Sequence, residues 1–170
     1  MRDRNALIVE QIPRLRRYAR ALTGDATLAD DLVQDSVERA WRKFHLWRRG
    51  SDLRAWMFTI MHNLHVNAVR QGSRRPPVVS LADWDGDTAL RPVQEIAAEV
   101  RGVVEALALL PVEQRQVILL VGLEGFTYQE VAKVVGIPVG TVMSRLFRGR
   151  QRLREITGEG KPQTQSLRKL

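Results

Sequence analysis

The stretch GIPVGTVMSRLFRGRQRLRE, residues 136–155, predicts a long basic helix that carries an aromatic side chain on its polar side. At about 100° per residue, one narrow stripe suited to packing on a core holds Val142, Leu146, Gly149 and Leu153. The opposite side of the helix holds Ser144, Phe147, Arg148 and Gln151. Five arginines and no acidic residue lie between Val139 and Arg154. We therefore expect a molecule outside the protein to contact the face around Phe147.

A short helix and a tight turn precede this basic helix. Thr127, with Glu130 three residues later, forms a capping-box pattern and predicts a helix over 128–135. The residues GIP at 136–138 predict the turn. A short helix, a glycine-containing turn and a second helix with a polar outer face indicate a helix-turn-helix unit.

The outer face of the second helix has the chemistry that a DNA major groove requires. Arginines can reach guanine edges or phosphates, and Ser144 and Gln151 can hydrogen-bond to either. Phe147 can cover a thymine methyl group or a sugar. In the alternative interpretation, Phe147 packs on the preceding helix and the arginines are only solvated. A solvated helix face usually mixes charges of both signs, whereas this one has no acid.

The overall composition favours a polyanionic partner. The 170 residues include 27 Lys and Arg against 19 Asp and Glu, which gives a formal charge of +8. Such a balance favours nucleic acid or an anionic membrane surface. The absence of cysteine excludes disulfides and thiolate metal sites. No apolar run reaches the length of a membrane span, and charges interrupt the position of a signal peptide, so we expect a cytoplasmic protein.

Apolar periodicity predicts an all-α protein. Three- and four-residue spacing predicts helices over 5–22, 26–44 and 53–70, and again near 92–110 and over 112–123. A stretch rich in proline, glycine and aspartate over 73–94 has no such period and predicts a flexible linker. The polar residues 159–170 predict a disordered tail. The sequence therefore predicts two small helical domains, 1–72 and 95–158, and the second contains the helix-turn-helix.

Charge is segregated along the first domain. Residues 25–38 carry five acids and no basic residue, and a run of arginines and lysines follows them. This acidic face, the basic run that follows it and the basic helix over 139–154 together indicate several partners.

Three segments together resemble a known family. The segment TYQEVAKVVGIPVGTVMSRLFRGRQRLR (127–154) resembles the fourth conserved region of the extracytoplasmic-function sigma factors of bacterial RNA polymerase, most specifically in GIPVGTVMSRLFRGR. The segment ADDLVQDSVERAW (29–41) resembles the polymerase-binding helix of their second region. The segment DLRAWMFTIMHNLHVNAVR (52–70) resembles their promoter-melting segment, which reads the −10 element. All three occur in the family's order and spacing.

The resemblance implies a role for particular residues. The residues that would bind a basic coiled coil in the largest subunit of core polymerase are Asp31, Gln34 and Asp35. The residues that would contact the −10 element are Asn63, Asn67, Arg70, Arg74 and Arg75. The residues that would read the −35 element are Thr141, Ser144, Arg145, Phe147, Arg148 and Gln151. Trp56 matches an aromatic that we interpret as core. The resemblance also implies promoter DNA as a partner and control by an anti-sigma factor that masks both domains.

Two positions depart from the family pattern. Met143 and Thr59 stand where the family commonly has basic residues. One phosphate or base contact is therefore expected to be missing at Met143, and the grip on the melted strand is expected to differ at Thr59.

Other classes of function fit the sequence less well. His62 and His65 could supply half of a metal site, but no third ligand stands at a useful spacing. The acids Asp30, Asp31 and Asp35 could bind Mg²⁺, but adjacent residues of a helix point in different directions. No phosphate-binding glycine loop and no Ser/His/Asp arrangement occurs. We expect no catalytic activity, no metal and no cofactor.

The main alternative is a stand-alone helix-turn-helix regulator that binds duplex DNA without polymerase. Such a protein does not need the acidic helix or the asparagine-bearing helix. A protein that binds a membrane surface through its basic helices is a weaker alternative, because the apolar stripes resemble core stripes.

Overall fold

The computed structural model describes residues 3–72 and 93–158, and within these residues every regular element is helical. The N-terminal helices are α1 (Arg4–Val9), α2 (Ile12–Thr23), α3 (Ala26–Lys43), the 3₁₀ helix η1 (Phe44–Leu46) and α4 (Leu53–Arg70). The C-terminal helices are α5 (Val93–Ala108), α6 (Val112–Gly122), α7 (Tyr128–Val135) and α8 (Val139–Thr157). The predicted all-α fold class is confirmed. Most of the expected linker and the whole of the expected tail lie outside the described residues.

The single helix that we predicted over 5–22 is wrong, because two helices occupy this range. α1 ends at Val9 and α2 begins at Ile12, with Pro13 in its first turn. Proline has no N–H to donate, and its ring clashes with the carbonyl group four residues earlier. The apolar spacing continues across the break, so periodicity alone does not reveal it.

Local signals set the other helix ends much as expected. Gly24 ends α2 in the left-handed region, with φ 66°. The Asp52 carboxylate accepts a hydrogen bond from the Ala55 N–H at 3.2 Å and so caps α4. At α7, the Thr127 hydroxyl accepts from the Glu130 N–H, and the Glu130 carboxylate accepts from the Thr127 N–H. The predicted capping box is confirmed.

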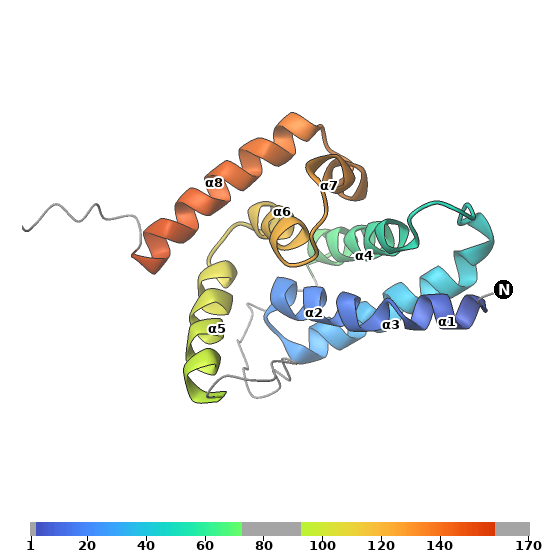
Figure 1. Ribbon diagram of the computed structural model, residues 1–170, viewed down its shortest axis with the longest axis horizontal. Coiled ribbons are helices and arrows are strands. Elements are labelled where there is room, and N and C mark those ends of the chain that lie inside the picture. The colour runs from blue at the N-terminus through green and yellow to red at the C-terminus, as the bar shows by residue number, and fades with distance from the viewer. Residues whose placement is uncertain (1–2, 73–92, 159–170) are drawn as a thin grey trace, which may run out of the picture.

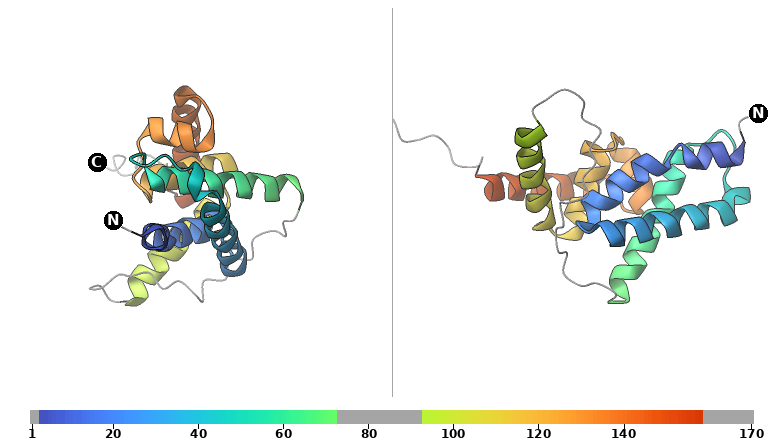
Figure 2. Two further views of the ribbon diagram at one scale, coloured as in Figure 1. Left: turned by 90° about the vertical axis from the view of Figure 1, so that its right-hand side faces the viewer. Right: turned by 90° about the horizontal axis from the view of Figure 1, so that it is seen from below.

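The C-terminal helices pack directly on the N-terminal helices. Figure 1 shows α8 at the top of the molecule, with α6 and α7 between it and the N-terminal helices. In this middle layer α6 packs on α2 and α8, while α7 packs on α4 and α8. The two further views show the same close association (Figure 2). Buried apolar residues of both sets belong to one continuous core. This packing was not predicted from the sequence.

A glycine lies at the contact between α6 and α8. Val142 and Leu146 of the predicted core stripe are buried, as expected. A Cβ atom at Gly149 would lie 2.6 Å from Ile118 Cδ1 and 3.3 Å from Gln114 Cβ. Both distances are shorter than an ordinary van der Waals contact. The glycine therefore lets α8 lie close against α6, and this packing turns the opposite face of α8 toward solvent.

Candidate polymerase and promoter interfaces

The outer face of α8 is exposed, and its aromatic side chain lies on it. Phe147 is 70% exposed, so the alternative in which it packs on the preceding helix is wrong. Arg148 and Gln151 are also exposed. The other predicted residues of this face are partly buried: Thr141, Ser144 and Arg145. The face can therefore present an apolar ring among hydrogen-bond donors to a partner.

A second apolar side chain joins Phe147 on this face. Met143 lies one helical turn before Phe147 and is 53% exposed. Residues four apart on a helix are surface neighbours, so the two side chains form a small apolar patch. From the sequence, Met143 was expected only to lack a basic contact. The four-residue spacing from Phe147 was the signal that could have revealed the patch.

The acidic face of α3 is open to solvent. Asp31, Gln34 and Asp35 are all exposed. Within the described residues neither Asp31 nor Asp35 makes an ion pair, whereas neighbouring Asp30 lies 3.5 Å from Arg16 of α2. The two unpaired carboxylates are available to a basic partner.

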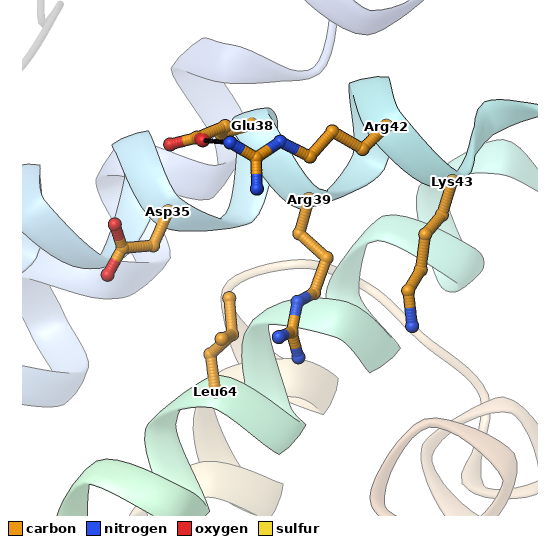
Figure 3. A pocket seen from close by; sticks show the side chains of 6 residues that line it. All are labelled: Asp35, Glu38, Arg39, Arg42, Lys43 and Leu64. Carbon is orange, nitrogen blue, oxygen red and sulfur yellow. Dashed lines mark ion pairs between the residues drawn. The ribbon is translucent and has the colours of Figure 1, made fainter.

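A cavity of about 370 Å³ lies between α3 and α4, beside this acidic face. The residues that line it are Asp35, Glu38, Arg39, Arg42, Lys43 and Leu64. Figure 3 shows Arg39 extending from α3 toward α4, and Leu64 extending from α4 toward α3. Glu38 forms an ion pair with Arg42. The charged residues that remain are Arg39, Lys43 and Asp35, and Leu64 adds an apolar side chain. This mixture suits contact with a protein surface better than binding of a metal ion.

The asparagines of α4 are accessible. Asn63, Asn67 and Arg70 are exposed. Asn63 and Asn67 are one helical turn apart, so their amide groups share one side of the helix. Arg74 and Arg75 lie outside the described residues. Trp56, which we predicted to be core, is only partly buried and packs edge-on against Phe44 with 6.4 Å between ring centroids.

The two histidines of α4 are both buried, and His62 lies against the C-terminal helices. His62 is 8% exposed and donates a hydrogen bond to the Val135 carbonyl at the end of α7. Burial lowers the pKa of His62, and the positive charge of Arg145 on α8 lowers it further. A metal cation beside Arg145 would meet the same repulsion. Among the described residues no group of three or more possible ligands could hold a metal ion.

None of the helices within 3–72 and 93–158 is both long enough and apolar enough to cross a membrane.

Each half of the chain matches a model of a known family. Residues 8–62 match the family model described as the Sigma2 domain of PhyR. Residues 101–153 match the model described as Sigma-70, region 4. Both halves of a bacterial sigma factor are therefore present in one chain.

Relatives and solved structures agree with this class. The ECF RNA polymerase sigma factor EcfG of Rhodopseudomonas palustris is 38% identical over 150 residues, which cover 86% of this chain and 80% of the relative. SigL of Mycobacterium tuberculosis, a second ECF sigma factor, is 35% identical over 144 residues, covering 83% and 81%. The chain belongs to the ECF RNA polymerase sigma factors. This family is not a class of enzymes.

Two solved structures share the arrangement of the helices. The sigma factor RpoE of Bartonella quintana, in complex with the anti-sigma factor NepR, aligns with a TM-score of 0.75 and 33% identity, covering 92% of this chain and 98% of that chain. CnrH, in complex with the cytosolic domain of CnrY, aligns with a TM-score of 0.67 and 25% identity, covering 92% and 88%.

Acidification should destabilise the fold through His62. The folded-state pKa lies below the unfolded value of about 6.5, so the unfolded chain binds the proton more readily. Stability is therefore full above about pH 6.5 and falls as the pH drops below it. Urea unfolding at pH 8 and pH 5.5 should show a smaller loss for His62→Gln than for the wild-type protein. The matched control is His45→Gln, at an exposed position, and an equal loss in all three proteins would contradict this assignment.

Proposed function

We propose that this sigma factor binds core RNA polymerase through α3, reads the −35 element through α8 and holds the opened −10 element through α4. As an ECF sigma factor the chain directs core polymerase to specific promoters and initiates transcription there. The observation that carries the residue assignments is the exposure of Phe147 on an acid-free face of the second helix of a helix-turn-helix.

The proposed −35 contacts follow from the chemistry of the α8 face. Arg148 and Gln151 are exposed and can reach phosphates or base edges. Phe147 and Met143 offer an apolar surface to thymine methyl groups. Arginine contacts to phosphate supply affinity, whereas the apolar and base-edge contacts discriminate between sequences.

The proposed −10 contacts follow from the exposed amides of α4. A base that leaves the stack must be held by hydrogen bonds to its edge and by stacking. Asn63 and Asn67 each offer a donor and an acceptor, and exposed Arg70 can neutralise a nearby phosphate. The expected phosphate contacts of Arg74 and Arg75 remain part of the proposal.

The proposed polymerase contact follows from the unpaired acids of α3. Asp31 and Asp35 present two negative charges to solvent, with Gln34 beside them. Complementary charges steer encounter and select the partner. We propose a basic coiled coil of the largest polymerase subunit as that partner.

We further propose that an anti-sigma factor controls this chain. RpoE and CnrH were each solved in a complex, the first with the anti-sigma factor NepR and the second with the cytosolic domain of CnrY. The similarity to both supports the same type of control here. We propose a cytoplasmic location, because core polymerase acts there, and no catalytic activity in the chain itself. The proposed domains are 1–72 and 95–158, joined by the linker 73–94 and followed by the tail 159–170.

Replacement of Phe147 should change promoter selection more than stability. Because this side chain is 70% exposed, Phe147→Ala should cost far less than the roughly 3–5 kcal/mol of a buried phenylalanine. The matched control is Leu146→Ala, which should cost about 2–5 kcal/mol at a buried position. Transcription from −35 variants should rank differently with Phe147→Ala, and Arg148→Ala should lower affinity and flatten its salt dependence. An unchanged promoter ranking beside a large drop in melting temperature would mean that Phe147 supports the fold.

Charge reversal on α3 should weaken polymerase binding. Asp31→Arg with Asp35→Arg replaces attraction by repulsion at the proposed interface. Affinity for core polymerase, measured by a pull-down at moderate salt, should fall by about tenfold or more. The control is the pair Glu105→Arg with Glu113→Arg, an identical change of charge on exposed residues of α5 and α6. Equal affinity of the two variants, each with native circular dichroism, would remove α3 from the interface.

Truncation of Asn63 should affect strand opening and leave −35 binding intact. Asn63→Ala removes an exposed amide, so the fold should be unaffected. Transcription from a double-stranded −10 element should drop, while binding to a duplex −35 element stays normal. On a template that is already open at the −10 element, Asn63→Ala should reduce transcription by a smaller factor. Normal transcription across all −10 variants would assign Asn63 no role in opening.

A further inference from the structure

A buried carboxylate joins the two sets of helices. The Glu124 side chain, in the turn between α6 and α7, is fully buried. Its Oε1 accepts hydrogen bonds from Arg17 of α2, at 2.9 Å from Nη2 and 3.3 Å from Nε. The Arg17 side chain is 45% exposed. This ion pair connects residues 107 positions apart in the sequence.

An arginine of α4, the helix proposed to contact the −10 element, contacts the same turn. Arg54 of α4 donates a hydrogen bond from Nη1 to the Glu124 carbonyl at 2.9 Å. Its guanidinium lies 4.0 Å from the centroid of the Phe126 ring. The Phe126 ring in turn packs edge-on against Phe58 of α4, with 5.3 Å between centroids. Polar and aromatic contacts thus cross between the sets at one place.

A buried arginine of the C-terminal set also makes a contact with the N-terminal set. Arg115 of α6 donates a hydrogen bond to the Leu22 carbonyl at the end of α2, at 2.7 Å. Its other donors bind carbonyl groups of its own set, those of Leu107, Ala108 and Leu110. His62 adds its hydrogen bond to the Val135 carbonyl. We call these contacts, centred on Glu124 and made by Arg17, Arg54, Phe126, Arg115 and His62, the Glu124 clasp.

In the clasped arrangement, the distance between α4 and α8 is too short for the two helices to reach both promoter elements. α7 packs on both α4 and α8. Axes of packed helices lie about 8–10 Å apart, so α4 and α8 lie within roughly 20 Å of each other. Elements at −35 and −10 are about 25 base pairs apart, or roughly 85 Å at 3.4 Å per base pair. The two helices cannot occupy both elements while α7 separates them.

We propose that the Glu124 clasp is an autoinhibitory contact, which keeps the protein closed on its own and must open before α4 and α8 can occupy both promoter elements. This inference rests on the proposed function, because the promoter contacts of α4 and α8 define what the closed form prevents. The clasp belongs to the chain itself, so closure needs no anti-sigma factor. A partner that prefers the closed form would act on an equilibrium that already exists.

The chemistry of the clasp suits reversible closure. Glu124 Oε2 has no hydrogen-bond partner among the described residues. A buried ion pair gains little net free energy because desolvation opposes the Coulomb attraction, although removal of one partner is costly. Arg17 can regain water as soon as the two sets separate, since it is already half exposed. The clasp therefore orients the two sets closely without making separation prohibitive.

The distance between the two sets tests the proposal without polymerase. The chain has no cysteine, so spin labels can be placed at will. Asn5→Cys on α1 and Lys133→Cys on α7 are exposed positions outside the clasp. Double electron–electron resonance should give one short, narrow distance for the clasped protein. Arg17→Met and Glu124→Gln should increase the long-distance population by roughly tenfold or more, the usual effect of losing a charge-assisted hydrogen bond.

Arg16→Met is the matched control. It removes the same charge from the neighbouring residue, whose ion pair with Asp30 stays within the N-terminal set. It should leave the distance unchanged. A long distance in the otherwise wild-type protein, or equal distributions for Arg16→Met and Arg17→Met, would overturn the clasp. If Glu124→Gln fails to fold by circular dichroism, Arg17→Met alone decides, because its side chain is half exposed.

Promoter binding and transcription separate this inference from the proposed function. Core polymerase saturated with unlabelled Arg17→Met should bind a promoter that carries both elements up to about tenfold more tightly than core polymerase with Arg16→Met, because the open fraction is larger. Unchanged affinity beside a changed distance would overturn the regulatory role of the clasp. Failure of the wild-type protein to support promoter-specific transcription by core polymerase would instead overturn the proposed function, whatever the distances show.

Discussion

The fully buried carboxylate of Glu124 constrains the arrangement of the whole molecule. A carboxylate removed from water requires compensating donors, and Arg17 supplies them from another helix set. Burial, reinforced by the negative charge of Glu124, raises the pKa of Tyr18, which packs on Phe58 in the same region. The turn between α6 and α7 therefore occupies one place relative to α2 and α4. The position of α8 follows from it, since α8 packs on both α6 and α7.

The surfaces proposed to bind partners face away from this shared core. Phe147 is exposed because the other side of α8, which holds Leu146 and Gly149, packs on α6. The acids of α3 are exposed because the opposite side of the helix, which holds Ala29, Val33 and Ala40, packs in the core. Closure thus leaves individual contact residues accessible and restricts only the distance between them. Regulation by geometry differs in this respect from regulation by direct masking of a contact surface.

The region between α3 and α4 brings two proposed functions together. Asp35, from the proposed polymerase surface, lines the same cavity as Leu64, which is next to Asn63 in α4 (Figure 3). Packed helices are rigid on the scale of their side chains, so a partner seated against α3 can influence the orientation of α4. The proximity offers a physical route by which polymerase binding and strand opening could be coupled.

The sequence by itself determined the helices, their caps and the chemistry of each outward face, because these depend on contacts three or four residues apart. The limits of α4 and α7, the Thr127 capping box and the exposed side of Phe147 all followed from local spacing. Even locally, the interruption at Pro13 was missed, because apolar spacing does not register a lost hydrogen bond. Only the tertiary structure revealed the Glu124 clasp, whose main ion pair spans 107 positions. A lone glutamate in a turn has the same local pattern whether it faces water or an arginine from a distant helix, so its partner is decided by packing.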